Sequence, residues 1–363
     1  MAMEILEAGA LTTIQDQGHR GGASRGYQEN GVCDCYSYQI ANLLAGNLGS
    51  SMEQGRRNTV RGAASDGGGE AVAPAVLEMT LRGAEIRFSS HEIVALAGAD
   101  MMPQINGVSV PMYCPLILRP GDVLKLGTAA AGLRTYLAVH GGINAPLLMG
   151  SRSTSLNCHI GGLEGRALRA GDQLCSLSSP RANNHIRKKL EKHVAEWVAA
   201  AEKYPLPASG TRVADSVPYP ILRAVVGPQA EAFTEAGLRV FEQTAFQLSA
   251  QSNRMACKLT GAAIETYHGS DMISDGIVAG SVQVASDGMP IVMMADHQTT
   301  GGYAKIATVI SADLPRLAQR RPGELVGFRF VTPQEAVAAT RLMAGRLAKI
   351  RQELLTLCGG DVQ

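Results

Sequence analysis

The sequence predicts a mainly β protein with some α-helix, and three observations lead to that class. Short segments such as Leu77–Leu81 and Glu85–Phe88 alternate apolar and polar residues between turn residues. One turn-then-strand pattern occurs three times, at residues 119–124, 169–174 and 321–326. Helical periodicity is confined to a few stretches. Because the third copy of the turn lies in the second half of the chain, we expect two β-rich domains, each a barrel or a sandwich.

Length and composition exclude several classes of protein. The chain has 363 residues, enough for two domains with a core each, and its net charge of +1 argues against nucleic acid as a partner. The amino terminus shows no signal-peptide pattern, and no apolar run approaches the ~20 residues of a membrane span. The 7 cysteines are odd in number and scattered, which fits reduced thiols. We therefore expect a cytoplasmic protein that contacts no membrane.

The first elements of the chain are a strand, a polar loop and a helix. Ala10–Gln15 is predicted as a strand. Within the glycine-rich stretch that follows, Gly22–Gly26 matches the G-x-S-x-G pattern of a hydrolase nucleophile elbow. That elbow requires an apolar strand before the serine and a helix after it, and the flanks here are polar, so we interpret the match as a loop. A helix capped by Asp34 is expected to end at Gly46.

Further patterns suggest how the domains are divided. A glycine-rich stretch with few large apolar residues, 55–76, is predicted to be a mobile insertion. Apolar side chains between Ile186 and Ala201 recur on one face of a helix. Thr332 and Glu335 have the spacing of a capping box. The predicted segments are an amino-terminal β-barrel-like domain (1–179), an amphipathic helical linker (180–215), a second β-barrel-like domain (216–332) and a C-terminal helix (333–358).

The densest polar run is Asp296–Tyr303, with the sequence DHQTTGGY. It follows two apolar strands, 282–284 and 291–294, that Ser286–Gly288 joins with a hairpin-type turn. Donors and acceptors at the end of a strand, together with a glycine pair, are typical of a binding loop. A solvated hairpin loop remains the alternative.

This run, together with residues 252–255 and 311–317, resembles the second domain of the 5-oxoprolinase C-subunit family, also described as biotin-dependent carboxyltransferase-like or allophanate hydrolase subunit 2-like. The resemblance implies a pair of cyclophilin-like β-barrels. It also implies an ATP-hydrolysing hydrolase that opens 5-oxo-L-proline to L-glutamate with the A and B subunits of 5-oxoprolinase, the B subunit being the most direct partner. The first half is similar to the same family, in order, at residues 9–16, 41–47, 96–100, 138–143 and 150–154.

Motifs for common cofactors are absent from the sequence. It contains no G-x-x-x-x-G-K-[ST], no G-x-G-x-x-G and no H-E-x-x-H, so ATP would need an unconventional site or one on another chain, and no metal is expected. The biotinylation signature Met-Lys-Met is also absent, so biotin would have to arrive on a partner. Two alternatives stay open: the carboxyltransferase component of a biotin-dependent urea-carboxylase-like system, and a non-catalytic regulatory partner of a kinase-inhibitor protein that resembles the B subunit.

Candidate site residues combine acid–base and anion-binding chemistry. Arg254 offers a rigid fork for a carboxylate or phosphate, and we expect it to share one site with Asp296. A structural ion pair is an equally good interpretation of each charged residue taken singly. His297 stands where the family usually has arginine, and histidine keeps no fixed charge at neutral pH. The catalytic candidates are Asp296, Asp275 and Lys305; the substrate- or anion-binding candidates are Asn253, Arg254, Gln283, Gln298, Thr299, Thr300, Gly301, Gly302, Tyr303, Ser151 and Arg152.

Overall fold

The computed structural model describes residues 3–19, 21–47, 72–178, 188, 204–205 and 217–357. The chain divides into two compact units, each discontinuous in sequence. Residues 55–71 of the predicted mobile insertion and nearly all of the predicted linker helix at 180–215 lie outside the described residues, so those parts stay predictions. The predicted end of the insertion at 76 is wrong, because Ala75 and Val76 are fully buried and Val76 begins a strand. Unit 1 consists of Met1–Arg20, Cys35–Pro205 and Leu347–Gln363, and unit 2 of Gly21–Asp34 and Leu206–Arg346.

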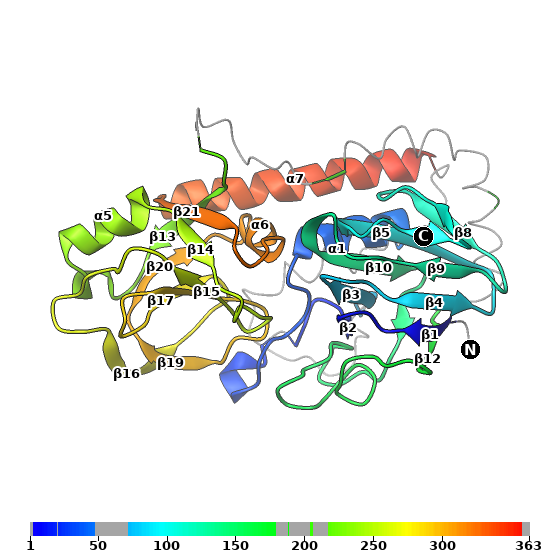
Figure 1. Cartoon of the computed structure of the whole chain (residues 1–363), viewed down its shortest axis with the longest axis horizontal. Coiled ribbons are helices and arrows are strands. Elements are labelled where there is room, and N and C mark those ends of the chain that lie inside the picture. The colour runs from blue at the N-terminus through cyan, green and yellow to red at the C-terminus, as the bar shows by residue number, and fades with distance from the viewer. Residues whose placement is uncertain are drawn as a thin grey trace, which may run out of the picture. The chain divides into compact units, whose positions relative to one another are not determined.

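Unit 1 contains two antiparallel sheets that share one hydrophobic core (Figure 1). Core side chains such as Ile86 and Phe88 come from the first sheet, and Leu77 and Leu96 come from the second. The first sheet has the strand order β11 (Ile143–Asn144), β12 (Gln173–Ser176), β1 (Met3–Glu7), β4 (Glu85–Phe88), β9 (Val123–Lys125), β6 (Gln104–Ile105) and β7 (Val108–Ser109). The second has the order β2 (Leu11–Gln15), β3 (Val76–Thr80), β10 (Ala131–Val139), β5 (Glu92–Asp100) and β8 (Pro115–Leu118).

The mainly β fold class is confirmed. The described residues of unit 1 form two sheets around one core, which is within the expectation of a barrel or a sandwich, and the barrel-like form of this domain stays a prediction. The outer strands of the first sheet, β7 and β11, have two residues each. Turn spacing alone does not separate these two architectures, because barrels and sandwiches both consist of short strands joined by turns.

The predicted first helix is confirmed as α1 (Cys35–Leu44), which packs against β5 and β10. Gly46 follows it with a φ of 81°. The Gly46 N–H donates to the Leu43 carbonyl (3.1 Å), and the Asn47 N–H donates to the Asn42 carbonyl (2.9 Å). Glycine adopts this left-handed conformation without steric cost, so it ends the helix where the sequence predicts.

Unit 2 is built on a closed seven-stranded barrel (Figure 1). The helix α5 (Glu235–Gln243) packs on it through Phe241, whose ring stacks on Phe328 with centroids 4.5 Å apart. A shorter helix, α6, spans Leu314–Ala318. The barrel order is β13 (Ile221–Val226), β20 (Lys305–Val309), β17 (Ser281–Val284), β18 (Pro290–Met293), β15 (Ala256–Thr260), β14 (Phe246–Leu248) and β21 (Leu325–Phe330), and β21 pairs in parallel with β13.

The predicted hairpin of unit 2 is confirmed. Strands β17 and β18 pair in antiparallel fashion, with Val282 opposite Val292. The turn between them is closed by the Ala285 N–H, which donates to the Met289 carbonyl (3.0 Å), and Gly288 has a φ of 79°. This conformation explains why an Asp-Gly pair predicts the turn.

The three turn-then-strand copies share one geometry. In each, the glycine (Gly121, Gly171 or Gly323) has a φ between 88° and 94° and donates its N–H to a strand carbonyl. The acidic side chain that follows accepts the backbone N–H of the arginine three positions earlier, which fixes the direction in which the next strand leaves. These pairs are Asp122 with Arg119 (2.7 Å), Asp172 with Arg169 (2.7 Å) and Glu324 with Arg321 (3.1 Å).

The predicted C-terminal helix is confirmed as α7 (Pro333–Leu357). The Thr332 hydroxyl accepts the Glu335 N–H (3.2 Å), and the Glu335 carboxylate accepts the Thr332 N–H (2.8 Å), which is the reciprocal capping box. Of the helices in the described ranges, none is both long and apolar enough to cross a membrane.

Candidate functional site

The predicted polar run leads from the barrel of unit 2 into a two-stranded ribbon. This ribbon consists of β16 (Asp271–Gly276) and β19 (Thr300–Tyr303). Asp275 lies opposite Gly301 in the ladder, and Gly276 lies opposite Thr300. Because β20 begins two residues after β19 ends, Lys305 lies at the junction of ribbon and barrel.

Lys305 and Asp275 form an ion pair at this junction. The Lys305 Nζ lies 2.5 Å from Asp275 Oδ2 and also donates to the Gly276 carbonyl (2.7 Å). The lysine side chain is only 6% exposed, whereas the aspartate is 50% exposed. Gln229 joins the pair, because its Nε2 donates to Asp275 Oδ2 (3.2 Å) and its Oε1 accepts the Lys305 N–H (3.2 Å). One oxygen of Asp275 therefore receives two side-chain donors.

The pKa of Asp275 lies below its ordinary value. The main cause is the hydrogen bond from Lys305, followed by the bond from the Gly276 N–H (2.7 Å). Both donors favour the ionised carboxylate. At neutral pH Asp275 is therefore ionised and can accept hydrogen bonds, while Lys305 holds it in place from the buried side.

Gln283 fixes the other side of the junction. It is 1% exposed, and its Nε2 donates to the Tyr303 carbonyl (3.1 Å). A Cβ added at Gly301 would lie 2.7 Å from that same Nε2, whereas one added at Gly302 would meet no atom closer than 3.4 Å. The backbone thus approaches Gln283 closely at Gly301, where a Cβ would force the ends of the Gln283 and Ile277 side chains to shift. Thr299 extends the contact between the two ribbon strands, since its carbonyl accepts the Ile277 N–H (3.0 Å).

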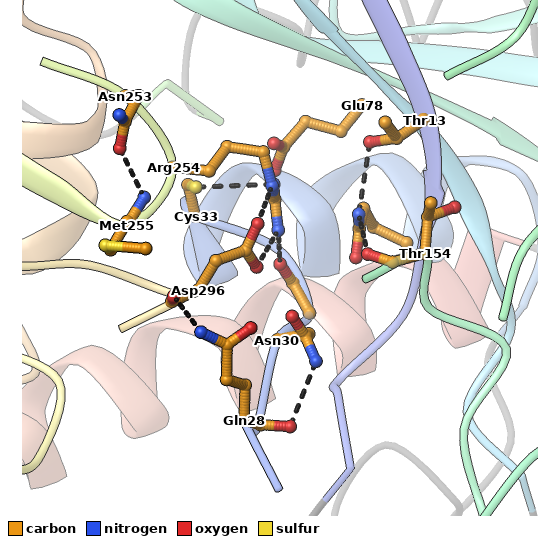
Figure 2. Close-up of polar contacts among 12 residues, drawn as sticks. Thr13, Gln28, Asn30, Cys33, Glu78, Thr154, Asn253, Arg254, Met255 and Asp296 are labelled. Atoms are coloured by element: carbon orange, nitrogen blue, oxygen red, sulfur yellow. Dashed lines mark hydrogen bonds and ion pairs between the residues drawn. The ribbon is translucent and has the colours of Figure 1, made fainter. Parts of the chain in front are cut away.

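Arg254 and Asp296 form a second, buried cluster in unit 2 (Figure 2). Arg254 Nε donates to Asp296 Oδ2 and its Nη2 donates to Asp296 Oδ1, both at 2.9 Å. Both side chains are almost fully buried, at 4% and 3% exposure. Backbone bonds align the two loops that carry them, because the Asp296 N–H donates to the Arg254 carbonyl (2.9 Å). The two residues, which were expected to share one site, thus form a two-pronged ion pair with each other.

The same arginine holds residues 28–33 of unit 2. Its Nη2 donates to the Gly31 carbonyl (2.5 Å), and its Nη1 lies 3.4 Å from Cys33 Sγ. Gln28 reaches the pair from the other side, where its Nε2 donates to the Asp296 carbonyl (3.0 Å), as Figure 2 shows. The pair therefore connects a segment from early in the chain to two barrel loops.

These contacts bear on what Arg254 can bind. Its guanidinium fork grips a carboxylate of its own chain, and its terminal nitrogens also face Gly31 and Cys33. The geometry favours a structural ion pair that shapes the loop, and the proposed anion-binding and proton-transfer roles stay predictions. Asn253 shapes the adjoining turn, with its Oδ1 accepting the Met255 N–H (2.8 Å). His297 is buried at 2% exposure, and its Nδ1 lies 2.7 Å from the Gln298 carbonyl.

In unit 1, Ser151 and Arg152 surround a buried carboxylate, that of Asp16. Asp16 Oδ1 accepts the Ser151 hydroxyl (2.6 Å) and the Ser153 hydroxyl (2.7 Å), and Oδ2 accepts the Arg152 N–H (2.7 Å). The Gly18 N–H (2.8 Å) is a further donor to Oδ1. The Arg152 guanidinium turns to the Ala145 carbonyl. Arg152 thus meets the carboxylate through its backbone and not through its charge.

The structure therefore places the predicted residues in three groups. One group is the Lys305–Asp275 junction with Gln283, Thr299 and the ribbon strand Thr300–Tyr303, a second is the Arg254–Asp296 pair, and the third is the Asp16 network of unit 1. Within the described ranges, no three His, Cys, Asp or Glu side chains gather as a metal site would need.

Comparison with known proteins places the chain in a family. Residues 69–330 match the family model of the carboxyltransferase domain, subdomain A and B. The chain is 35% identical over 337 residues to the C subunit of 5-oxoprolinase from Escherichia coli (strain K12), covering 93% of this chain and 94% of that protein. The chain belongs to the 5-oxoprolinase C-subunit family. A second relative of the same name, from Haemophilus influenzae, is 32% identical over 96% of this chain and 98% of its own length.

More distant relatives of this C-subunit family member are parts of longer fungal proteins. A putative urea carboxylase of Emericella nidulans is 28% identical over 93% of this chain but only 25% of its own length. The crystal structure of the Kluyveromyces lactis urea carboxylase aligns with a TM-score of 0.75 and 23% identity, covering 96% of this chain and 29% of that one. This likeness shows a shared fold.

Sequence reasoning missed several residues of these three groups. Gln229 lies in the loop after β13 and carries no local signal of its contact with Asp275. Asp16 was visible only as the residue after a predicted strand and the last of the family-like residues 9–16, and its side-chain partners Ser151 and Ser153 lie 135 and 137 positions away. A polar residue at the end of a buried strand, paired with a Ser-x-Ser run, is the pattern that would have indicated this network.

Proposed function

We propose that this chain is the C subunit of an ATP-dependent 5-oxoprolinase and helps to open 5-oxo-L-proline to L-glutamate. The observation that supports this most is coverage: the two bacterial relatives named as C subunits of 5-oxoprolinase match over 94% and 98% of their own lengths. A relative that matched this chain over only part of its own length would support the same function less strongly. The reaction class is taken from the family, and the catalytic roles proposed below are assigned to residues of unit 2.

The Lys305–Asp275 junction is the part of unit 2 that we assign to the reaction. Asp275 is half exposed, so its carboxylate can reach the water that attacks the lactam and act as the base that accepts its proton. Thr300 begins the ribbon strand, Gln298 and Thr299 directly precede it, and together they offer amide and hydroxyl groups that can orient the lactam. Lys305 positions Asp275.

The proposed complex contains the A and B subunits as well and uses ATP. An unactivated lactam resists hydrolysis, and phosphorylation of its carbonyl oxygen would create a good leaving group. We assign neither the ATP site nor that step to this chain, whose sequence has no phosphate loop. The B subunit is the expected direct partner, and the cytoplasmic location stays a prediction.

A second candidate is the carboxyltransferase component of a biotin-dependent urea-carboxylase-like system. The match to the putative urea carboxylase over 93% of this chain favours it. In that case biotin would reach unit 2 on a carrier domain of a partner, and the substrate would be a small amide such as urea. The two candidates require different second substrates, so one assay separates them.

The test is an assay of the complex co-expressed with the A and B subunits. We expect ATP-dependent release of glutamate from 5-oxo-L-proline, and no ATP-dependent carboxylation of urea when a biotinylated carrier is added. Asp275→Asn keeps the shape of the side chain but removes proton transfer, so turnover should fall by about 10²- to 10⁴-fold. The matched control is Asp271→Asn, which changes an exposed aspartate on the same strand and should leave turnover unchanged. Equal activity of both variants would contradict the role of Asp275.

A further inference from the structure

The ribbon that carries Asp275 is thin and exposed. Within the described residues, β16 pairs only with β19, and the two strands form a separate sheet at one edge of unit 2 (Figure 1). Every residue of β16 except Met272 is exposed. An isolated two-stranded ribbon is at best marginally stable in water. The position of the Asp275 carboxylate therefore depends on the bonds that join the ribbon to the barrel.

Gln229 is one of the side chains that make this connection, and it bonds to both sides. Its Nε2 donates to Asp275 Oδ2 (3.2 Å) on the ribbon, and its Oε1 accepts the backbone N–H of Lys305 (3.2 Å) at the start of β20. The opposite polarity of the two contacts fixes which end of the amide faces Asp275. A glutamine makes both bonds at once, whereas a leucine could make neither and a glutamate only the second.

The segment that carries Gln229 packs closely against β20. The Gly227 N–H donates to the Ile306 carbonyl (2.8 Å), and a Cβ added at Gly227 would lie 2.1 Å from the Lys305 carbonyl oxygen. The Gln229 carbonyl accepts the Ala232 N–H (3.0 Å). The backbone of Gln229 is thus held on both sides, and its side chain reaches the ribbon from a fixed point on the barrel.

The contacts distinguish the two oxygens of the Asp275 carboxylate. A carboxylate oxygen can accept about two hydrogen bonds. Oδ2 receives the Lys305 ammonium (2.5 Å) and the Gln229 amide, whereas Oδ1 receives only the Gly276 N–H (2.7 Å) among the described residues. Oδ1 therefore keeps one accepting position. Because the Asp275 side chain is 50% exposed, a water molecule can reach this oxygen from solvent.

We propose that Gln229 is a positioning residue that, together with Lys305, occupies Oδ2 of Asp275 and leaves Oδ1 to accept the proton of the attacking water. This inference rests on the proposed function, in which Asp275 is the base. Gln229 itself moves no proton. It acts by holding the ribbon at a fixed distance from the barrel, and a misplacement of a catalytic group by about 1 Å can lower a rate by about 100-fold.

The charges at the junction make this role testable. Lys305 is the charged group that faces Asp275 in the described part of unit 2; its hydrogen bond is the main cause of the low pKa of that carboxyl, and the bond from Gln229 acts in the same direction. Gln229→Glu keeps the length of the side chain and the acceptor for the Lys305 N–H, but it places a second carboxylate where the donor was. Two carboxylates this close repel each other, so one of them keeps its proton to a higher pH.

The first measurement is a pH titration of the Asp275 Cγ resonance by NMR in the purified chain, with the resonance assigned by its loss in Asp275→Asn. Gln229→Glu should move the titration midpoint upward by about one pH unit or more, and Gln229→Leu should move it upward by less, because Lys305 stays in place. The matched control is Gln247→Glu. It makes the same change at an exposed glutamine whose Nε2 donates to the Gly323 carbonyl (2.9 Å), and it should leave the titration of Asp275 unchanged.

The second measurement is the pH dependence of turnover by the complex with the A and B subunits. Gln229→Leu should lower kcat by about 10- to 100-fold with little change in KM, because the groups that orient the lactam stay in place. In Gln229→Glu, the fall of the rate on the acidic side should begin about one pH unit higher, whereas Gln247→Glu should follow the parent profile. Melting temperatures check that the variants are folded, and Gln229→Glu retains the bond to β20 if Gln229→Leu does not fold.

An unchanged titration of Asp275 in Gln229→Glu would overturn the positioning role. A lower kcat for Gln229→Glu without any change in the pH profile would also overturn it, because a merely structural role reduces the rate equally at every pH. If the titration moves as expected but the complex does not cleave 5-oxo-L-proline, the positioning of Asp275 stands and the proposed function fails. If the complex is active and Asp275→Asn is not, but the Gln229 variants behave as the parent does, the positioning role fails alone.

Discussion

The buried pair of Arg254 and Asp296 leads to a sharp prediction about the stability of unit 2. Arg254→Lys keeps the positive charge but cannot reproduce the two parallel bonds of 2.9 Å or reach the Gly31 carbonyl and Cys33 in the same pose. If the arginine binds substrate, the melting temperature should stay unchanged and only activity should fall. The observed contacts predict instead that the melting temperature falls.

The size of the effect follows from the hydrogen bonds and the burial. A hydrogen bond to a charged group contributes about 1.5–3 kcal/mol, so Arg254→Lys should lower the melting temperature of a unit of this size by roughly 3–12 °C. Arg254→Met leaves Asp296 buried without its partner and should cost about 3–5 kcal/mol. The double variant Arg254→Met with Asp296→Leu removes both charges and should recover most of that loss.

Thermal and urea unfolding of the parent chain, these three variants and the single variant Asp296→Leu measures the differences. The matched control is Arg239→Lys, because Arg239 is 61% exposed and pairs with Glu235 at 3.5 Å, a contact that contributes at most about 0.5 kcal/mol. An unchanged melting temperature for Arg254→Lys, with reduced activity of the complex, would refute the structural interpretation and support anion binding. A double variant that loses as much as the sum of its single changes would also contradict the pair.

Two other predictions concern one glycine and one histidine. Gly301→Ala places a Cβ against Gln283 and Ile277 and should cost about 1–3 kcal/mol in unfolding experiments, whereas Gly302→Ala has room and should change stability little, so similar melting temperatures would contradict the close approach. Burial lowers the pKa of His140, so the folded state favours the neutral ring, and its contribution to stability should be complete above about pH 6.5 and fall as the pH drops below that value. His140→Gln should therefore flatten the loss of melting temperature between about pH 7.5 and 5.5, and an equally steep loss would show that other groups cause it.

Local signals in the sequence were the reliable ones. The Asp-Gly hairpin, the helix that ends at Gly46 and the capping box of Thr332 and Glu335 each depend on residues within a few positions of one another, and all three are present. The repeated turn was recognisable for the same reason, since Asp172 contacts a backbone N–H only three positions away. Such features are determined by backbone conformation and short-range hydrogen bonds.

Contacts that join distant segments could not be inferred in the same way. Arg254 contacts Gly31 across 223 positions, and Asp16 contacts Ser153 across 137. Nothing in the local pattern states that residues 21–34 belong with unit 2. Arg254 and Asp296 were expected to share a site because each lies in a polar motif. The motifs did not indicate that the hydrogen bonds of each side chain are made to the other. That depends on burial, which is a property of the whole fold.

The central claim is that this chain is a required component of an ATP-dependent 5-oxoprolinase. The most direct measurement is glutamate release from 5-oxo-L-proline by the A and B subunits, with and without this chain and with and without ATP. We predict that activity requires all three proteins and ATP, that the chain alone shows little turnover and that it co-purifies with the B subunit. Full activity without this chain, or robust ATP-dependent cleavage by this chain alone, would contradict the claim.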